Sequence, residues 1–162
     1  IYRHPHIYGN VKVKDDQEVK KNWESLKLSE GKNSVLEGVP NGLPALIKAQ
    51  RMQEKAAGVG FDWNTKNQVW SKFQEELHEL DEAIESNSFS EIEAEFGDVL
   101  FSLINYARFL KINPESALER TNQKFIQRFK FIESEAKKNG TIITELSLEE
   151  MEKFWEKAKN NN

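Results

Sequence analysis

The sequence predicts an all-α protein, organised as a four-helix bundle with short extra helices. Three observations support this prediction. Apolar residues recur every three or four positions along three segments of more than twenty residues. Ser, Thr or Asn stands at the start of each of these segments. Glycines follow the ends of two of the predicted helices, where a left-handed residue commonly stops an α-helix.

The first part of the chain is predicted to contain two helices. Residues 15–27 form a short one with an apolar side. A loop is expected at residues 29–41, because this stretch is polar and contains glycine and proline. Residues 43–57 form the second helix, and a Gly-Val-Gly run ends it.

Three long helices and a short one follow, at residues 65–86, 90–110, 113–139 and 147–159. Three of them begin with a capping-box pattern, in which Ser or Thr is followed three residues later by Gln or Glu. These pairs are Thr65 with Gln68, Ser90 with Glu93, and Ser147 with Glu150. The β-branched stretch at residues 141–144 is expected to be extended.

Two acidic pairs lie in the first two long helices. Glu76 and Glu79 belong to the first helix, and Glu95 and Asp98 belong to the second. Each pair has i, i+3 spacing, so both members project from the same side of their helix. The break at residues 85–90 allows the helices to fold back on each other and to bring the four carboxylates together.

Each acidic pair borders the apolar side that is predicted to be buried. In the first helix this side consists of Val69, Phe73, Leu77, Leu80 and Ile84. In the second helix it consists of Ile92, Phe96, Val99, Leu100, Leu103 and Ala107. A row of polar residues lies beside each apolar side. These residues are Lys72, Glu76 and Glu79 in the first helix and Glu95, Asp98, Ser102 and Asn105 in the second.

Four carboxylates beside a core would repel one another unless a cation lay among them. Ligands that are all oxygen atoms favour Mg²⁺ or Mn²⁺ over zinc or copper. The alternative is that these acids are simply solvated, as we expect for most other acidic residues of the two helices. The spacing alone does not decide between these interpretations.

The acidic residues form a larger motif, Glu75-Glu76-x-x-Glu79, then fifteen residues, then Glu95-x-x-Asp98. This motif resembles the signature of MazG-type nucleoside triphosphate pyrophosphohydrolases. The resemblance covers nearly the whole chain. It includes residues 38–63, 97–110 and 122–128 and the closing SLEEMEKFWEKAK.

The resemblance implies an all-α NTP pyrophosphohydrolase fold and a reaction. Nucleoside triphosphates would be hydrolysed to the monophosphate and pyrophosphate by attack of water on the α-phosphorus. The catalytic residues implied are Glu75, Glu76 and Glu79. The residues implied to bind Mg²⁺ (or Mn²⁺) are Glu76, Glu79, Glu95 and Asp98. Which carboxylate accepts the proton of the water stays open.

The same resemblance implies which residues bind the substrate. Lys124 and Arg128 fall on the family's KFxxR element, which contacts the triphosphate, although alone they would be read as solvated cations. Trp155 corresponds to a residue that lies against the nucleotide. The full set expected to bind the substrate is Lys72, Asn105, Asn122, Lys124, Arg128, Trp155 and Lys159. Arg108 is left as an ion-pair partner.

Family members are homodimers with sites near the dimer contact, and their activity is described as housecleaning. Two other functions stay open. One is an all-α enzyme selective for dUTP or dCTP, and the other is a non-catalytic nucleotide-binding or regulatory module. A di-iron site is disfavoured, because Glu75-x-x-His78 would need a second Glu-x-x-His pair, which His4 and His6 do not supply.

Composition limits the partners. The net charge of −4 argues against a general nucleic-acid binder, and the chain has no cysteine for a disulfide or a thiolate site. No run approaches the roughly 18 apolar residues of a membrane span, so we expect no membrane insertion and a cytoplasmic protein. Residues 1–14 are expected to be the tail of a preceding domain or a linker, with residues 15–162 as the MazG-like domain.

Overall fold

The structure is a computed structural model that describes residues 34–160 of the 162-residue chain. Several predictions lie outside these residues. They are the tail at residues 1–14 with His4 and His6, the helix at residues 15–27, and the start of the loop at 29–41.

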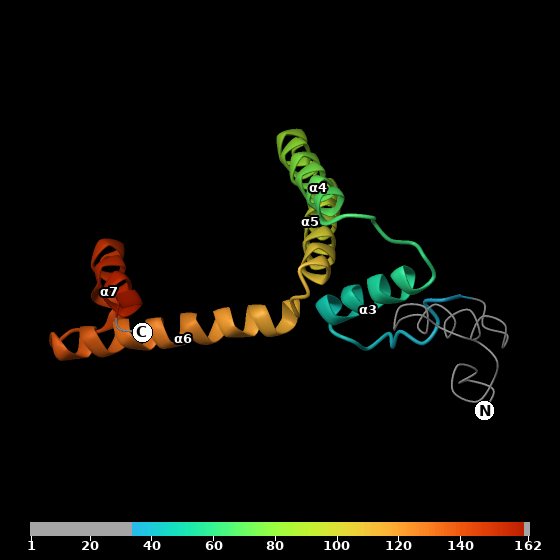
Figure 1. Cartoon of the computed structure of the whole chain (residues 1–162). Coiled ribbons are helices and arrows are strands. Elements are labelled where there is room, and N and C mark those ends of the chain that lie inside the picture. Colours follow the sequence, from blue (N-terminus) through green and yellow to red (C-terminus); the bar gives the residue numbers. More distant parts are fainter. Residues whose placement is uncertain (1–33, 161–162) are drawn as a thin grey trace, which may run out of the picture. The chain divides into compact units, whose positions relative to one another are not determined.

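The described residues form five α-helices and one short 3₁₀ helix (Figure 1). These elements are α3 (Ala45–Gly58), α4 (Lys66–Ser86), α5 (Phe89–Phe109), α6 (Pro114–Lys138), η1 (Ile143–Glu145) and α7 (Leu148–Asn160). No β-strand occurs between residues 34 and 160. The prediction of an all-α fold is confirmed.

Capping residues set two of the helix starts as predicted. The backbone N–H of Gln68 donates to Thr65 Oγ1, and the N–H of Thr65 donates to Gln68 Oε1. Ser147 and Glu150 make the equivalent pair of hydrogen bonds before α7. Each capping box satisfies backbone donors that have no partner within their helix.

One local prediction is wrong, and another holds only in part. Helix α5 begins at Phe89 after Ser88, so the predicted box of Ser90 and Glu93 does not cap it. Instead, the Ser86 hydroxyl donates to Glu91 across the turn between α4 and α5. The β-branched stretch at 141–144 is extended at Ile142, but the 3₁₀ helix η1 begins at the next residue.

The described residues belong to two compact units, which divide after Pro114. In the first unit, α4 and α5 lie side by side as an antiparallel helical hairpin (green and yellow in Figure 1), and α3 packs against α5. The indole of Trp70 contacts the Tyr106 ring at 5.0 Å between centroids, which ties the start of α4 to the end of α5. This hairpin carries both acidic pairs.

The second unit contains most of α6 together with η1 and α7. The rings of Phe125 on α6 and Trp155 on α7 lie 5.4 Å apart between centroids. Ile132 and Ala136 on α6 and Ala158 on α7 are buried. The two helices therefore pack through one aromatic contact and a small apolar core.

The predicted apolar sides of α4 and α5 are exposed in part. On α4, the buried positions are Val69, Glu76 and Ala83, while Leu77 and Ile84 lie at the surface. On α5, Ser102 and Ile104 are buried, while Phe96 is 55% exposed. We therefore correct the prediction: Glu76 and Ser102 of the polar rows are buried, while several residues of the apolar sides are exposed.

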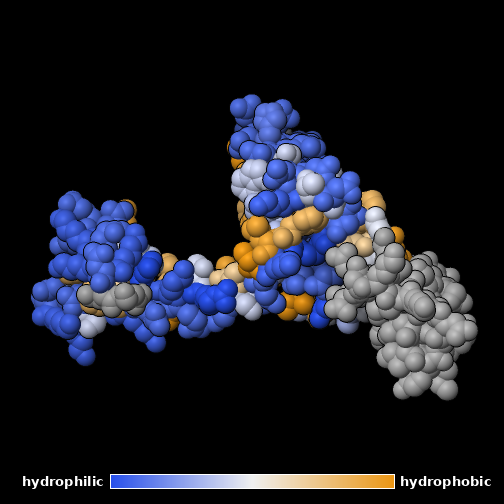
Figure 2. Space-filling model, viewed as in Figure 1, coloured by the Kyte–Doolittle hydropathy of each residue, from blue (hydrophilic) through white to orange (hydrophobic). Residues whose placement is uncertain are grey.

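Figure 2 shows hydrophobic surface on part of the first unit. Six large apolar side chains of α4 and α5 are exposed, and we call them the apolar face: Leu77, Ile84, Phe89, Phe96, Leu100 and Leu103. Solvated side chains of this size and number are unusual on a monomeric protein. None of the described helices is long and apolar enough to cross a membrane.

Candidate active site

Three of the four predicted metal ligands lie together between α4 and α5. One carboxylate oxygen from each of Glu76, Glu79 and Glu95 lies within 4.8 Å of the others. We call these three residues the acidic cluster. Asp98 lies outside this group and is exposed, although it lines the same cavity as Glu76.

The turn between the helices explains why the acids meet. Asn87 adopts a left-handed conformation, with φ of 60°, which asparagine tolerates better than most residues. Glu79 lies eight residues before Asn87, and Glu95 lies eight residues after it. At 1.5 Å per helical residue, both acids therefore stand at about the same height, roughly 12 Å from the turn.

Lys72 supplies positive charge at the edge of the cluster. Its ammonium nitrogen lies 2.6 Å from Glu75 Oε1 and 2.8 Å from Glu76 Oε1. The hydrogen bond to Glu75, followed by that to Glu76, raises the pKa of Lys72 above its ordinary value. The ammonium group therefore stays charged throughout the physiological range.

Glu79 lies in the least favourable electrostatic position of the cluster. Desolvation raises the pKa of Glu79, and the nearby charges of Glu76, Glu75 and Glu95 raise it further, while Lys72 partly offsets them. A raised pKa means that the ionised carboxylate is destabilised in the folded chain. The cluster is therefore short of positive charge despite the presence of Lys72.

The donor set of the cluster fits a hard divalent cation. All three groups offer carboxylate oxygens, and Glu76 is buried while Glu79 and Glu95 are partly exposed. Mg²⁺ and Mn²⁺ prefer such ligands, but the geometry alone does not choose between them. The predicted catalytic residue Glu75 is held beside the cluster by Lys72.

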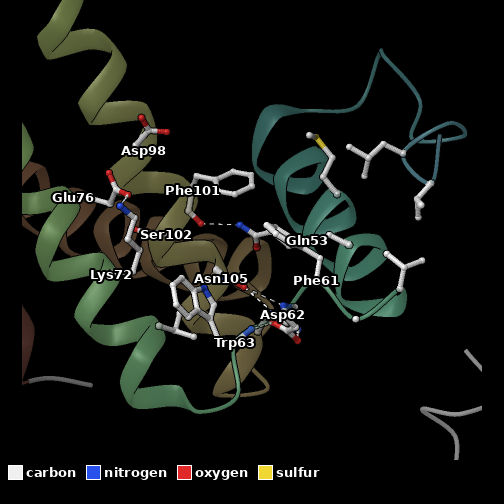
Figure 3. Close-up of a pocket in the computed structure, with 18 of the residues that line it drawn as sticks. Gln53, Phe61, Asp62, Trp63, Lys72, Glu76, Asp98, Phe101, Ser102 and Asn105 are labelled. Atoms are coloured by element: carbon white, nitrogen blue, oxygen red, sulfur yellow. Dashed lines mark hydrogen bonds and ion pairs between the residues drawn. The ribbon is translucent and has the colours of Figure 1, made fainter. Parts of the chain in front are cut away.

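A cavity of about 740 Å³ opens beside the acidic cluster in the first unit. Figure 3 shows Lys72, Glu76 and Asp98 at one part of it and Gln53 and Phe61 at another, with the Trp63 indole beside Lys72. Its lining is mostly apolar, with the polar groups concentrated on α4 and α5. Such a volume and lining are typical of sites for small organic ligands.

Asn105 and Arg108 hold the aromatic loop against α5. The guanidinium of Arg108 forms an ion pair with both carboxylate oxygens of Asp62. Its Nε and Nη2 also donate to Asn105 Oδ1. The interpretation of Arg108 as an ion-pair partner is confirmed, and the pair fixes the segment that carries Phe61 and Trp63.

The remaining predicted substrate-binding residues lie in the second unit. The Arg128 guanidinium lies over the Trp155 ring at 5.5 Å, and its Nε is buried without a partner among the described residues. Lys124 is exposed, Asn122 donates to Glu119, and Lys159 pairs with Glu156. The structure therefore brings Arg128 and Trp155 together, whereas Asn122 and Lys159 contact neighbours on their own helices.

Sequence reasoning missed Gln53. This residue of α3 is only 7% exposed, lines the cavity and hydrogen-bonds to the carbonyl oxygen of Phe101. A signal was present, because Gln53 is a polar residue four positions after Ala49 and three before Ala56, on the apolar side of α3. His78, by contrast, is exposed beside Glu82, in agreement with its interpretation as a surface residue.

Several known proteins are similar to this chain. Residues 64–132 match the MazG nucleotide pyrophosphohydrolase domain. A nucleoside triphosphate pyrophosphohydrolase/pyrophosphatase MazG from Thermotoga maritima is 42% identical over 100% of this chain and 62% of that protein. A nucleoside triphosphate pyrophosphohydrolase from Escherichia coli is 36% identical over 97% of this chain and 62% of that protein.

A third relative is the uncharacterised protein YabN of Bacillus subtilis, which is 47% identical over 98% of this chain and 33% of that protein. The chain thus spans about three fifths of the first two relatives and one third of YabN. The matched domain includes the acidic cluster, Asp98 and Arg128. Residues 64–132 therefore correspond to a MazG nucleotide pyrophosphohydrolase domain.

Proposed function

We propose that this protein hydrolyses nucleoside triphosphates to nucleoside monophosphates and pyrophosphate. The observation that carries the proposal is the position of the acidic cluster beside a cavity of about 740 Å³. Carboxylates that can hold a divalent cation provide a place for a polyphosphate, and the apolar part of the cavity provides a place for a nucleoside. The relatives from Thermotoga maritima and Escherichia coli, both named nucleoside triphosphate pyrophosphohydrolases, support the same reaction.

We assign the cation to Glu76, Glu79 and Glu95, with Asp98 as a further ligand, and favour Mg²⁺, with Mn²⁺ as the alternative. When bound, this cation would neutralise phosphate charge and supply an activated water. Neutralisation is needed, because desolvation and the neighbouring carboxylates already raise the pKa of Glu79. A polyphosphate would otherwise be repelled from the cluster.

The protein's own cations have separate roles in this proposal. Lys72 lies beside the cluster and would offset charge on the triphosphate as it develops in the transition state. Lys124 and Arg128 would hold phosphate oxygens, and the indole of Trp155 would contact the nucleotide beside Arg128. Asn105 and Asn122 would supply hydrogen bonds, and Lys159 a further positive charge.

Glu75 is the proton acceptor that we assign. It lies next to Glu76 in sequence but outside the three-carboxylate group, so a cation does not need its oxygens. The hydrogen bond from Lys72 holds its carboxylate close to the cluster. Glu75 would therefore take a proton from the attacking water while Glu76 and Glu79 hold the cation.

Product analysis tests the reaction. The protein is incubated with each of several nucleoside triphosphates, with and without Mg²⁺, and the products are separated by ion-exchange chromatography. Monophosphate and pyrophosphate formed only with metal support the proposal. Diphosphate and phosphate would show that attack occurs at another phosphorus, and the absence of turnover would favour a nucleotide-binding module.

We also propose that the protein is a homodimer in the cytoplasm. The apolar face of the α4–α5 hairpin supports the dimer, because a second copy could cover it with the same face of its own. Few apolar side chains are fully buried between residues 34 and 160, so this part of the chain gains little hydrophobic stabilisation alone. Light scattering that gave the mass of one chain would contradict this proposal.

A further inference from the structure

Gln53 lines the cavity and carries a hydrogen-bond acceptor that has no partner among the described residues. Its Nε2 donates to the carbonyl oxygen of Phe101 at 2.8 Å. A backbone carbonyl accepts hydrogen bonds and cannot donate them, so the amide must turn its NH₂ group toward Phe101. The Oε1 atom is therefore the free end of the side chain, and its orientation is fixed.

This acceptor is buried without a partner. Oε1 of Gln53 receives no hydrogen bond from any described residue, and the residue is 7% exposed. A buried polar atom that has lost its water and gained no partner is unfavourable, so such atoms are rare in folded proteins. Since Gln53 lines the cavity, a ligand in the cavity can supply the missing donor.

The surroundings of Gln53 fit a flat, apolar ring. Met52, Ala56 and Val59 line the cavity on its α3 side. Figure 3 places the ring of Phe61 beside Gln53 and that of Phe101 above it. Apolar and aromatic walls favour a planar heterocycle over a sugar, because sugar hydroxyl groups would lose their water without gaining partners.

The cavity therefore has two chemically different parts. Glu76, Asp98 and Lys72 are suited to the polyphosphate and its cation, and Gln53 and the aromatic residues are suited to the base. We infer that Oε1 of Gln53 accepts a hydrogen bond from an N–H group of the nucleobase and thereby selects which bases bind. This inference rests on the proposed function for the triphosphate end of the ligand.

The inference is tested by comparing how tightly the protein binds each nucleotide and an analogue of it that lacks one N–H donor. Affinities are measured by calorimetry with α,β-methylene triphosphates, in which a carbon bridge blocks pyrophosphate release. Each of the four bases is compared with an analogue that lacks its exocyclic amino group or carries a methyl group on its ring N–H. For at least one base, we expect the analogue to bind about tenfold more weakly to the native protein.

A Gln53→Met variant completes the comparison. It keeps the volume of the side chain but removes the acceptor. The affinity for the parent nucleotide should therefore fall about tenfold, and the parent and its analogue should bind equally well. Gln50→Met is the matched control, because Gln50 lies on the same helix, contacts Glu54 and does not line the cavity. This control should bind the parent nucleotide more tightly than its analogue, as the native protein does.

Several results would overturn the inference. One is equal binding within every pair by the native protein, a result that does not depend on the variant folding. Another is discrimination that persists in Gln53→Met. A third result concerns the sugar. If Gln53→Met stops distinguishing 3′-deoxy nucleotides from their parents, but still distinguishes the base analogues, the sugar and not the base lies at Gln53.

Turnover of the hydrolysable parents is measured separately. If the pairs are discriminated but no parent is hydrolysed, the base site stands and the proposed reaction fails. If the parents are hydrolysed without discrimination, the reaction stands and the base site fails. The absence of any nucleotide binding would overturn both.

Discussion

The ammonium nitrogen of Lys72 lies 2.8 Å from a carboxylate oxygen of Glu76, one turn further along α4. The buried member of the acidic cluster is therefore already paired with a cation from its own helix. A divalent ion that uses Glu76 must share this carboxylate with Lys72. The same lysine is then free to turn toward a phosphate.

Replacement of Lys72 tests this competition. The Lys72→Met variant should bind Mn²⁺ about three- to tenfold more tightly without nucleotide, because an ammonium group no longer competes for Glu76. Its kcat/KM for triphosphates should nevertheless fall, because charge on the phosphates is less well offset. Calorimetry gives the first quantity and initial rates give the second. Lys66→Met, near the start of α4, should change neither, and weaker metal binding by Lys72→Met would contradict the prediction.

Removal of charge at Glu79 should separate stability from activity. Glu79→Gln should lower kcat/KM by about a hundredfold, as loss of a metal ligand usually does. The metal-free variant should melt at the same temperature as the native protein or higher, because it no longer holds an unfavourable charge. Initial rates measure the effect on kcat/KM. Calorimetric melting with and without Mg²⁺ measures the effect on stability, since the cation should stabilise only the native protein.

The control for this experiment is Glu82→Gln, which changes an exposed acid on the same helix. It should leave turnover and the stabilisation by Mg²⁺ unchanged. Full activity in Glu79→Gln at ordinary Mg²⁺ concentrations would remove Glu79 from the site.

The pH dependence of the metal-free protein follows from the same residue. The pKa of Glu79 is higher in the folded chain than in the unfolded chain. A carboxyl group of this kind favours folding while it is protonated, and this contribution is lost as the pH rises through its folded pKa. Denaturant midpoints measured upward from about pH 4 should fall more in the native protein than in Glu79→Gln. Parallel curves for the two proteins would contradict the prediction.

Glu150 should show the opposite behaviour at the start of α7. Hydrogen bonds from the backbone and side chain of Ser147 lower the pKa of Glu150. The cap therefore stabilises the folded chain above the ordinary pKa of a glutamic acid. This stabilisation is lost as the pH falls through the pKa of Glu150 in the folded chain. Amide NMR signals in the first turn of α7 report this loss. In Glu150→Gln, whose amide oxygen accepts the same hydrogen bonds at any pH, these signals should stay constant in acid.

The proposed dimer predicts a strong effect of charge on the apolar face. Phe96→Glu should convert a dimer into monomers, because a carboxylate would be buried without a partner in the contact between two copies. Light scattering coupled to size exclusion measures the mass. Glu93→Lys, an even larger change of charge on the same helix, should leave the mass unchanged. A dimer that survives Phe96→Glu would place the contact elsewhere.

The helices and the acidic cluster could be predicted because they depend on local rules. Thr65 caps α4 through its own neighbours, and Glu76 and Glu79 share a side of α4 by helical geometry alone. The burial of these sides could not be predicted as reliably. Leu77 was expected inside, yet Leu77 is exposed and Glu76 is buried, because periodicity shows that a face will be covered without showing what covers it.

The cavity could not be predicted because it depends on packing between distant segments. Gln53 and Phe101 are 48 residues apart in sequence, and Asp62 and Arg108 are 46 residues apart. No local pattern joins such residues, and Gln53 alone could have been an ordinary polar substitution in an amphipathic helix. Only the packing of α3 on α5 gives its free oxygen a direction.

The equal distances from Asn87 to Glu79 and to Glu95 restrict how this chain can vary in length. Deletion of one residue between Asn87 and Glu95 would turn both acids of α5 by about 100° and shift them by about 1.5 Å. Extra residues at the tip, by contrast, would leave the facing sides of the helices unchanged. Proteins that keep this site should therefore gain or lose residues at the tip, or in matched numbers on both helices.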